Sequence, residues 1–108
     1  MTFDEIFSTV SQLAEQNRVA LSSAGDTSAD LHITGESGGI IGAAIKNGVP
    51  SITKGSVGSP EATVAISADD FASLLAGKLN PMLAVMTGRI KVSGNYAKLM
   101  GLIKGLKG

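Results

Sequence analysis

The sequence predicts an α+β protein with a sheet of about five, largely antiparallel strands covered on one face by helices. Strand-like runs separated by turn signals follow one another between residues 29 and 67, and helical patterns precede and follow them. Strands grouped in this way, with helices at the ends, are typical of sheets whose helices cover one face. We expect residues 1–108 to form a single domain, because this length suits one hydrophobic core and the chain shows neither a repeat nor a linker.

The first predicted helix begins at a capping box. Thr2 and Glu5 have the T-x-x-E spacing in which each side chain bonds the backbone N–H of the other residue. Apolar residues then recur at helical spacing on one face, at Phe3, Ile6, Phe7, Val10, Leu13 and Ala14. Either residues 17–18 interrupt this helix, or the pattern continues to Ala24 and ends before Gly25.

A series of strands is predicted next. Their ranges are Ala29–Gly35, Ile40–Lys46, Val49–Thr53 and Glu61–Ser67, and residues 26–28 are expected to form a loop before the first of them. In the first strand, Leu31 and Ile33 alternate with polar residues, which predicts one buried face and one polar face. Val64 and Ile66 are expected to face the core from the fourth strand.

The second and third strands are predicted to form a hairpin. Asn47 and Gly48 separate them, and both residues tolerate the positive φ that a two-residue hairpin turn requires. Pro50 has no N–H to donate to a neighbouring strand. The third strand is therefore expected at an edge of the sheet.

Two short helices, a strand and a last helix are predicted in the second half of the chain. The residues that begin and end the short helices are Ser67, Gly77, Asn80, Pro81 and Gly88. Residues 89–93 alternate as a strand, and Gly94-Asn95 turns the chain. The last helix then carries an apolar stripe at Tyr96, Leu99, Met100, Ile103 and Leu106.

The composition is aliphatic and poor in charge. Hydrophobic residues make up 44% of the chain, aromatic residues 4% and charged residues 17%, and the mean hydropathy is +0.27. Typical domains contain about 25% charged residues, so this chain holds more apolar material than a small domain easily buries. The surplus favours an internal cavity or an apolar partner surface.

The charges are unevenly placed along the chain. Residues 1–77 hold three basic and nine acidic residues, a net charge of −6, whereas residues 78–108 hold six basic residues and no acidic one, a net charge of +6. Either the two parts interleave in the fold and the charges mix, or the basic C-terminal third forms a patch. Such a patch would make transient contact with an anionic membrane or an acidic partner.

The sequence lacks the residue sets that catalysis and metal binding require. It has no cysteine and a single histidine, His32, which is expected to be solvent-exposed on the polar face of its strand. Asp69 and Asp70 suit the positive end of a helix dipole better than an acid–base pair, because adjacent helical residues point in different directions. Phosphate-loop and nucleic-acid-binding patterns are also missing. We therefore expect no enzyme activity, cofactor, metal or nucleic-acid partner.

Targeting signals are also missing from the sequence. The N-terminus is acidic and lacks the basic region of a signal peptide, and no apolar run approaches the ~20 residues of a membrane helix. The C-terminus lacks a peroxisomal address of the Ser-Lys-Leu type. We expect a cytoplasmic protein.

A specific pattern extends from Asp69 to Asn95. An acidic pair precedes Phe71, G-K-L-N-P follows at residues 77–81, and G-R-I-K-V precedes Gly94-Asn95. This pattern resembles the sterol carrier protein 2 family. The resemblance continues into the last helix, whereas the first half of the chain agrees with the family only in the order of its helices and strands. The resemblance implies a non-catalytic carrier, with an apolar tunnel between sheet and helices that holds sterols, fatty acids, fatty acyl-CoA or phospholipids.

The resemblance also implies that apolar side chains of the second half line the tunnel. Without the resemblance, the same side chains would be interpreted as ordinary core. The candidates are Phe71, Leu74, Leu75, Leu79, Met82, Leu83, Met86, Ile90, Val92, Leu99, Met100 and Ile103. Methionine adapts to varied apolar ligands, and the low aromatic content favours a flexible acyl chain over a rigid sterol. The last helix is a candidate lid.

An alternative interpretation gives the same apolar surface to a partner protein. The chain would then be an interaction module, which forms a homodimer or serves as a pocket subunit of a lipid-metabolising enzyme.

Overall fold

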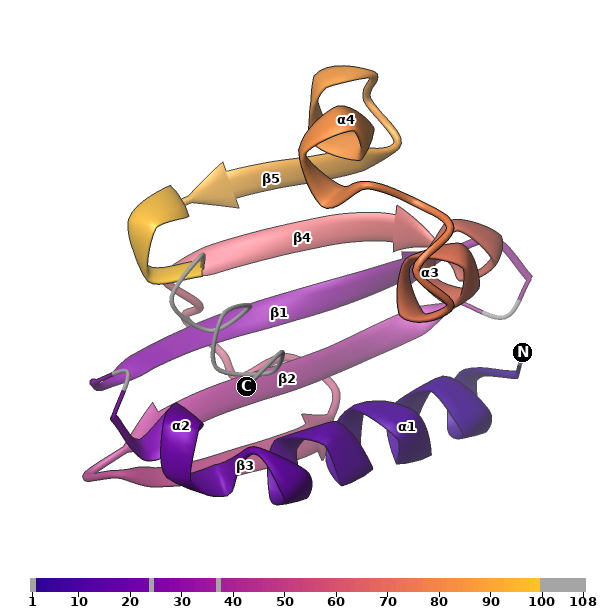
Figure 1. Ribbon diagram of the computed structural model, residues 1–108. Helices are drawn as coiled ribbons and strands as arrows, with labels where there is room; N and C mark the ends of the chain where they lie inside the picture. The colour runs from indigo at the N-terminus through magenta and orange to yellow at the C-terminus, as the bar shows by residue number, and fades with distance from the viewer. Residues whose placement is uncertain (1, 24, 37, 100–108) are drawn as a thin grey trace.

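The computed structural model describes residues 2–23, 25–36 and 38–99, and its centre is a five-stranded sheet with the order β3-β2-β1-β4-β5 (Figure 1). The strands are β1 (Thr27–Thr34), β2 (Gly39–Lys46), β3 (Val49–Lys54), β4 (Ala62–Ser67) and β5 (Ile90–Gly94). β1 and β4 run parallel, and the other neighbouring strands run antiparallel. The predicted α+β fold with a largely antiparallel sheet is therefore confirmed.

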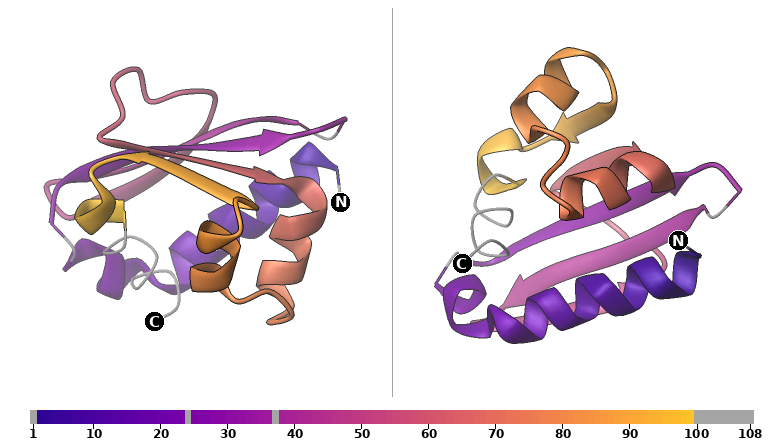
Figure 2. Two further views of the ribbon diagram at one scale, coloured as in Figure 1. Left: turned by 90° about the horizontal axis from the view of Figure 1, so that it is seen from above. Right: turned by 45° about the vertical axis from the view of Figure 1, so that its right-hand side comes forward.

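The helices lie on one face of the sheet, here called the inner face (Figure 2, left). They are α1 (Phe3–Gln16), α2 (Arg18–Ser22), α3 (Ala68–Leu75) and α4 (Pro81–Met86). Residues 96–99 are also helical. The connection from β3 to β4 crosses the opposite, outer face. In the part of the chain that the structure describes, no helix has the length and apolar character to cross a membrane.

Local signals placed the first helices correctly. The Thr2 N–H donates to Glu5 Oε1 at 2.8 Å, and the Glu5 N–H donates to Thr2 Oγ1 at 3.2 Å, so the capping box is present. The hydrogen bond from the Thr2 backbone is the main reason that the pKa of Glu5 lies below its ordinary value. Asn17, with φ −110° and ψ 25°, interrupts the helix, and α2 begins directly after it.

The hairpin between β2 and β3 also follows the prediction. Asn47 and Gly48 have φ values of 53° and 77°, and β3, which contains Pro50, is an edge strand of the sheet. β1 begins at Thr27, inside the expected loop, because residues 27 and 28 already pair with Ile45 and Ala44 of β2. The expected strand boundaries were thus off by up to two residues at this end of the sheet.

A buried carboxylate holds the crossover on the outer face. Asp30 is only 4% exposed; its carboxylate accepts hydrogen bonds from the Val57 N–H at 2.9 Å and from the Ser56 hydroxyl. Gly42 lies opposite Asp30 on β2, and a Cβ there would lie 2.6 Å from the Gly55 carbonyl oxygen. The glycine therefore lets the crossover lie directly on the sheet, where it covers Asp30.

Replacing Asp30 by alanine is expected to lower the free energy of unfolding by about 2 kcal/mol. Hydrogen bonds to charged groups contribute roughly 1.5–3 kcal/mol each, and the donors of the freed crossover regain part of this from water. Asp30→Asn keeps an acceptor for the Val57 N–H, so it should lose about half as much. Urea denaturation measures both values, and equal losses for the two variants would show that the hydrogen bonds do not hold the crossover.

Candidate functional site

The apolar layer between the sheet and the helices is divided into two clusters, at opposite ends of the sheet. One cluster contains Ile6, Val10, Ile33, Ile41, Ile66, Phe71, Ala84 and Ile90. The other contains Ala14, Leu21, Ala29, Ile45, Ala62 and Leu99. On β1 and β4, the first cluster takes Ile33 and Ile66 near the C-terminal ends, and the second takes Ala29 and Ala62 near the N-terminal ends.

Half-buried aliphatic side chains cross the inner face between these clusters. Leu31 on β1 pairs with Val64 on β4, and Val64 pairs in turn with Val92 on β5. Val64 and Val92 contact both clusters, as does Ile52 on β3. We call Leu31, Val64 and Val92 the central apolar row. Neighbouring strands lie about 4.8 Å apart, so the row spans roughly 10 Å of continuous apolar surface.

The central apolar row keeps solvent-accessible surface in the middle of the fold, where most proteins bury their side chains completely. Its three side chains are half-buried, whereas Ile33, Ile41 and Ile66 near them are 3% exposed or less. The row offers only methyl and methylene groups, so it can bind an apolar molecule by excluding water and has no group for acid–base chemistry.

The structure distributes the candidate lining residues over three environments. Phe71, Ile90 and Leu99 are buried in the two clusters; Leu74, Leu79 and Val92 are half-buried; and Leu75, Met82, Leu83 and Met86 are exposed. Met100 and Ile103 lie outside the described residues. Of this set, Val92 stands in the central apolar row. The lining role of the twelve stays a prediction.

Sequence reasoning placed Leu31 and Val64 on the buried faces of their strands but did not include them among the candidate lining residues. The alternation of β1 and β4 identifies the face to which each side chain points. It does not reveal that the strands are neighbours, which brings the two side chains together. The signal that could have found the row is strand pairing, which the sequence alone does not supply.

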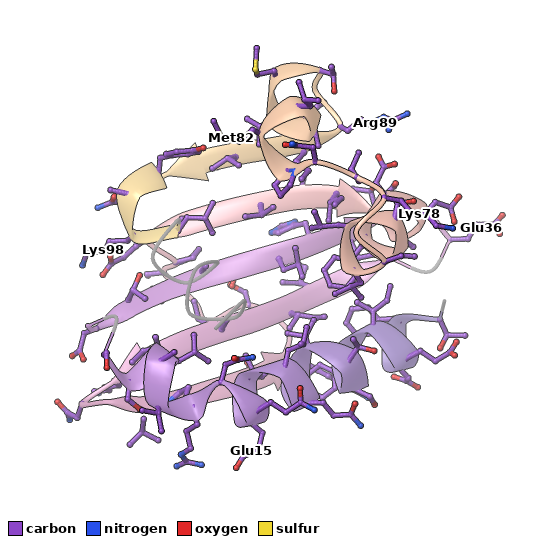
Figure 3. The ribbon with its side chains drawn as sticks, viewed as in Figure 1. Glu15, Glu36, Lys78, Met82, Arg89 and Lys98 are labelled. Atoms are coloured by element: carbon purple, nitrogen blue, oxygen red, sulfur yellow. The ribbon has the colours of Figure 1, made fainter. Side chains whose placement is uncertain are left out.

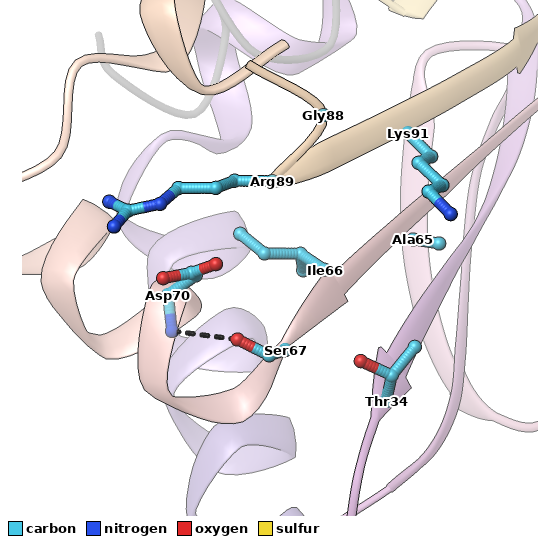
Figure 4. A pocket seen from close by; sticks show the side chains of 8 residues that line it. All are labelled: Thr34, Ala65, Ile66, Ser67, Asp70, Gly88, Arg89 and Lys91. Carbon is cyan, nitrogen blue, oxygen red and sulfur yellow. Dashed lines mark hydrogen bonds between the residues drawn. The ribbon is translucent and has the colours of Figure 1, made fainter.

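Two open clefts occur elsewhere in the described part of the molecule. One, of about 490 Å³, lies between α3 and α4 and is lined by Leu74, Leu75, Gly77, Lys78, Leu79, Asn80 and Pro81. The other, of about 280 Å³, lies at the end of β4 and is lined by Thr34, Ala65, Ile66, Ser67, Asp70, Gly88, Arg89 and Lys91 (Figure 4). Neither cleft includes a residue of the central apolar row.

The polar side chains that were considered as candidates for chemistry lie outside the row. The Asp70 N–H donates to Ser67 Oγ at 3.1 Å, which confirms Ser67 as the N-cap of α3 with Asp69 and Asp70 in its first turn. His32 is half-buried, not fully exposed as expected, on the outer face. Among residues 2–23, 25–36 and 38–99, no group of three or more histidine or carboxylate side chains could hold a metal ion.

The surface charges mix only in part. Lys98 of the basic C-terminal third forms an ion pair of 2.8 Å with Glu61. Lys78, Arg89 and Lys91 form no ion pair with any described residue. Within the part of the chain that the structure describes, Lys98 is therefore paired, whereas the cations before α4 and at the start of β5 are not.

Comparison with known proteins identifies the family to which the chain belongs. The model of the SCP-2 sterol transfer family matches residues 7–107. The chain belongs to this family. The fold agrees with that of a solved family member, sterol carrier protein 2 from Yarrowia lipolytica, with a TM-score of 0.67 and 26% identity over 94% of this chain and 87% of that one. The resemblance drawn from residues 69–95 is thereby confirmed.

Curated relatives of this family member include much longer proteins. Peroxisomal multifunctional enzyme A from Dictyostelium discoideum is 39% identical over 67 residues, which are 58% of this chain and 15% of that protein. Sterol carrier protein 2 from Homo sapiens is 34% identical over 58 residues, which are 54% of this chain and 11% of that protein. The chain thus matches less than a sixth of either relative.

Proposed function

We propose that this chain is a non-catalytic lipid carrier that holds one acyl chain between the sheet and the helices, along the central apolar row. The observation that carries the proposal is the half-buried row of Leu31, Val64 and Val92 between two closed clusters. Bound lipid would complete the divided apolar layer, and the space between sheet and helices would then be the tunnel expected for the family. Residues 1–108 would act as a single lipid-binding domain.

Apolar burial alone is sufficient for useful affinity. Each buried methylene contributes ~0.8 kcal/mol, so about fifteen methylenes of a palmitoyl chain contribute ~12 kcal/mol. Association costs at least ~4 kcal/mol of translational and rotational freedom. At most ~8 kcal/mol remains, which corresponds to a dissociation constant of about 1 μM.

The shape of the row favours a flexible chain over a fused ring system. The row is aliphatic, and the aromatic side chains Phe3, Phe7 and Phe71 belong to the cluster at one end, where Phe71 is buried. A saturated chain can follow the irregular surface of Leu31 and Val64, whereas a planar sterol needs a flat slot. We propose fatty acids, fatty acyl-CoA and phospholipids as ligands ahead of sterols.

Binding of a fluorescent fatty acid to the delipidated protein tests this proposal. We expect one fatty acid per chain, a dissociation constant in the micromolar range, and complete displacement by palmitate, with cholesterol competing more weakly. Mass spectrometry of lipids that co-purify with the protein identifies the natural class. Absence of binding in a delipidated protein that is folded by circular dichroism would refute the carrier proposal, and a stable dimer that ignores lipid would favour the interaction module.

A further inference from the structure

Helix α4 presents apolar side chains to solvent as well as to the core. Met82, Leu83 and Met86 are 61%, 58% and 78% exposed, whereas Ala84 is 1% exposed and Val85 is half-buried against the core. Residues 82, 83 and 86 share one side of a helix, because positions three or four apart are neighbours. We call Met82, Leu83 and Met86 the α4 surface.

The α4 surface is unusual for a helix at the edge of a protein. Such helices normally face water with polar side chains, yet residues 81–86 read P-M-L-A-V-M and include no polar side chain. A helix that is apolar all round requires an apolar environment on both sides. The structure places α4 at the end of the molecule away from α1, with its outer side free (Figures 1 and 3).

Two cations flank α4 in the chain. Lys78 precedes α4 and Arg89 follows it; both are exposed and lack an ion pair among the described residues (Figure 3). Lys91, the next cation along the chain, lies on the outer face of β5, opposite to the helices, and it lines one cleft together with Arg89 and the carboxylate of Asp70 (Figure 4). Lys78 and Arg89 still outnumber this carboxylate, and the chain has no acidic residue after Asp70. This combination of apolar and basic side chains matches an anionic bilayer.

Helix α1 does not offer the same combination. Its exposed residues include the acidic Asp4, Glu5 and Glu15, and its nearby cations are paired: Lys54 with Asp4 at 2.9 Å and Arg18 with Glu15 at 3.5 Å. An anionic surface would repel this side of the molecule.

A second copy of the chain fits the α4 surface poorly. A stable interface buries about 800 Å² on each partner, and a six-residue helix is only ~9 Å long. A two-fold axis at α4 would also bring Lys78 and Arg89 of one copy close to the same cations of the other.

We propose that the α4 surface docks this chain on anionic lipid bilayers, with Met82, Leu83 and Met86 in the acyl–headgroup boundary and Lys78 and Arg89 against the headgroups. The proposal rests on the proposed function, because a carrier must collect and release its lipid at a membrane. Helix α4 packs on β5, the edge strand that carries Val92 of the central apolar row. Docking through α4 would thus bring that edge of the binding region to the bilayer.

Co-sedimentation of the full chain with vesicles tests this proposal. We expect at least fivefold stronger binding to vesicles of phosphatidylcholine with 30% phosphatidylglycerol than to phosphatidylcholine alone. The preference should fall in 0.5 M NaCl, because salt screens exposed charges. The double variant Lys78→Gln/Arg89→Gln should lose most of the preference, since each cation near an anionic surface contributes roughly fivefold.

The apolar part of the surface is tested by Leu83→Gln/Met86→Gln, for which we expect at least tenfold weaker binding to the anionic vesicles. Val19→Gln is the matched control: Val19 is 83% exposed on α2, far from α4 in the chain, and its replacement should leave vesicle binding unchanged. Binding that is equal for wild type and the α4 variant, or an equal loss in the Val19 control, would overturn the proposal.

Fatty acid binding measured without vesicles separates this proposal from the carrier function. A chain that binds fatty acid but no vesicle overturns the docking surface and leaves the carrier standing. A chain that binds vesicles through α4 but no fatty acid overturns the carrier. Sedimentation equilibrium tests the other possible occupant, a second copy of the chain. If the wild type formed a dimer and bound no vesicles, and Leu83→Gln/Met86→Gln dissociated that dimer, the α4 surface would be a dimer interface.

Discussion

Gly94→Ala is expected to lower the free energy of unfolding by about 4 kcal/mol, a large part of the ~5–15 kcal/mol that stabilises a typical domain. Gly94 has a φ of +89°, where an L-residue with a side chain is strained by roughly 1–2 kcal/mol. A Cβ at this position would also lie 2.3 Å from the Glu61 carbonyl oxygen and 2.9 Å from the Ala62 Cα. Relief of this overlap requires backbone movement, which typically costs a further ~1–3 kcal/mol.

The overlap lies where β5 leaves the sheet. Gly94 pairs with Ala62 at the start of β4, and the next residue, Asn95, donates its N–H to the same Glu61 oxygen at 2.7 Å. Moving Glu61 away from an alanine Cβ would therefore weaken this hydrogen bond and the last pair of the β4–β5 ladder. Urea denaturation followed by circular dichroism measures the expected loss of stability.

Gly88→Ala provides a matched control for backbone strain. Gly88 has a φ of +81°, close to that of Gly94, but a Cβ there would meet no atom within 4 Å. We expect this variant to lose only about 1 kcal/mol, the cost of the positive φ. If Gly88→Ala and Gly94→Ala lost equal stability, the close approach of Glu61 would not be the reason that position 94 requires glycine.

The residues that carry the family resemblance are therefore mostly residues that turn or cap the chain. Gly77 has a φ of +74°, and the Asn80 side chain accepts hydrogen bonds from the N–H groups of residues 82 and 83. The Asn95 side chain accepts a hydrogen bond from the Lys98 N–H at 3.2 Å. These roles explain why the pattern between residues 69 and 95 predicted the fold well and indicated little about the binding region.

Local signals predicted the elements because their physical causes lie within a few residues. The capping box at Thr2, the Asn47-Gly48 turn and the caps at Ser67 and Asn80 each depend on short stretches of backbone. The burial of Asp30 could not be predicted in this way. It depends on a crossover that starts more than twenty residues later, and on which face of the sheet that crossover takes.

The candidate site was harder to predict for the same reason. Leu31, Val64 and Val92 are separated by about thirty residues each along the chain and meet only through the parallel pairing of β1 with β4 and the antiparallel pairing of β4 with β5. Helix α4 poses a different difficulty. Because both of its sides are apolar, spacing alone does not reveal that Ala84 faces the core while Met82 and Met86 face solvent.

Val64→Phe is expected to weaken fatty acid binding about 100-fold. Val64 stands in the middle of the central apolar row, between Leu31 and Val92, and contacts both clusters. A phenyl ring there would occupy the surface against which about four methylenes of the acyl chain lie. At ~0.8 kcal/mol per methylene, the loss is ~3 kcal/mol, which corresponds to roughly two orders of magnitude in the dissociation constant.

Two further variants of β4 distinguish blockage of the row from damage to the fold. Thr63→Phe places the same ring on the outer face, on a residue that is also half-buried, and should bind fatty acid like the wild type. Val64→Ala removes volume from the row and should change the dissociation constant by no more than about threefold, because the acyl chain can still cross the site and loses the contacts of only two methyl groups. Competition titrations with palmitate give the three dissociation constants, and circular dichroism confirms that each variant is folded. If Val64→Phe bound fatty acid as tightly as the wild type, the acyl chain would lie elsewhere, and the central apolar row would be core.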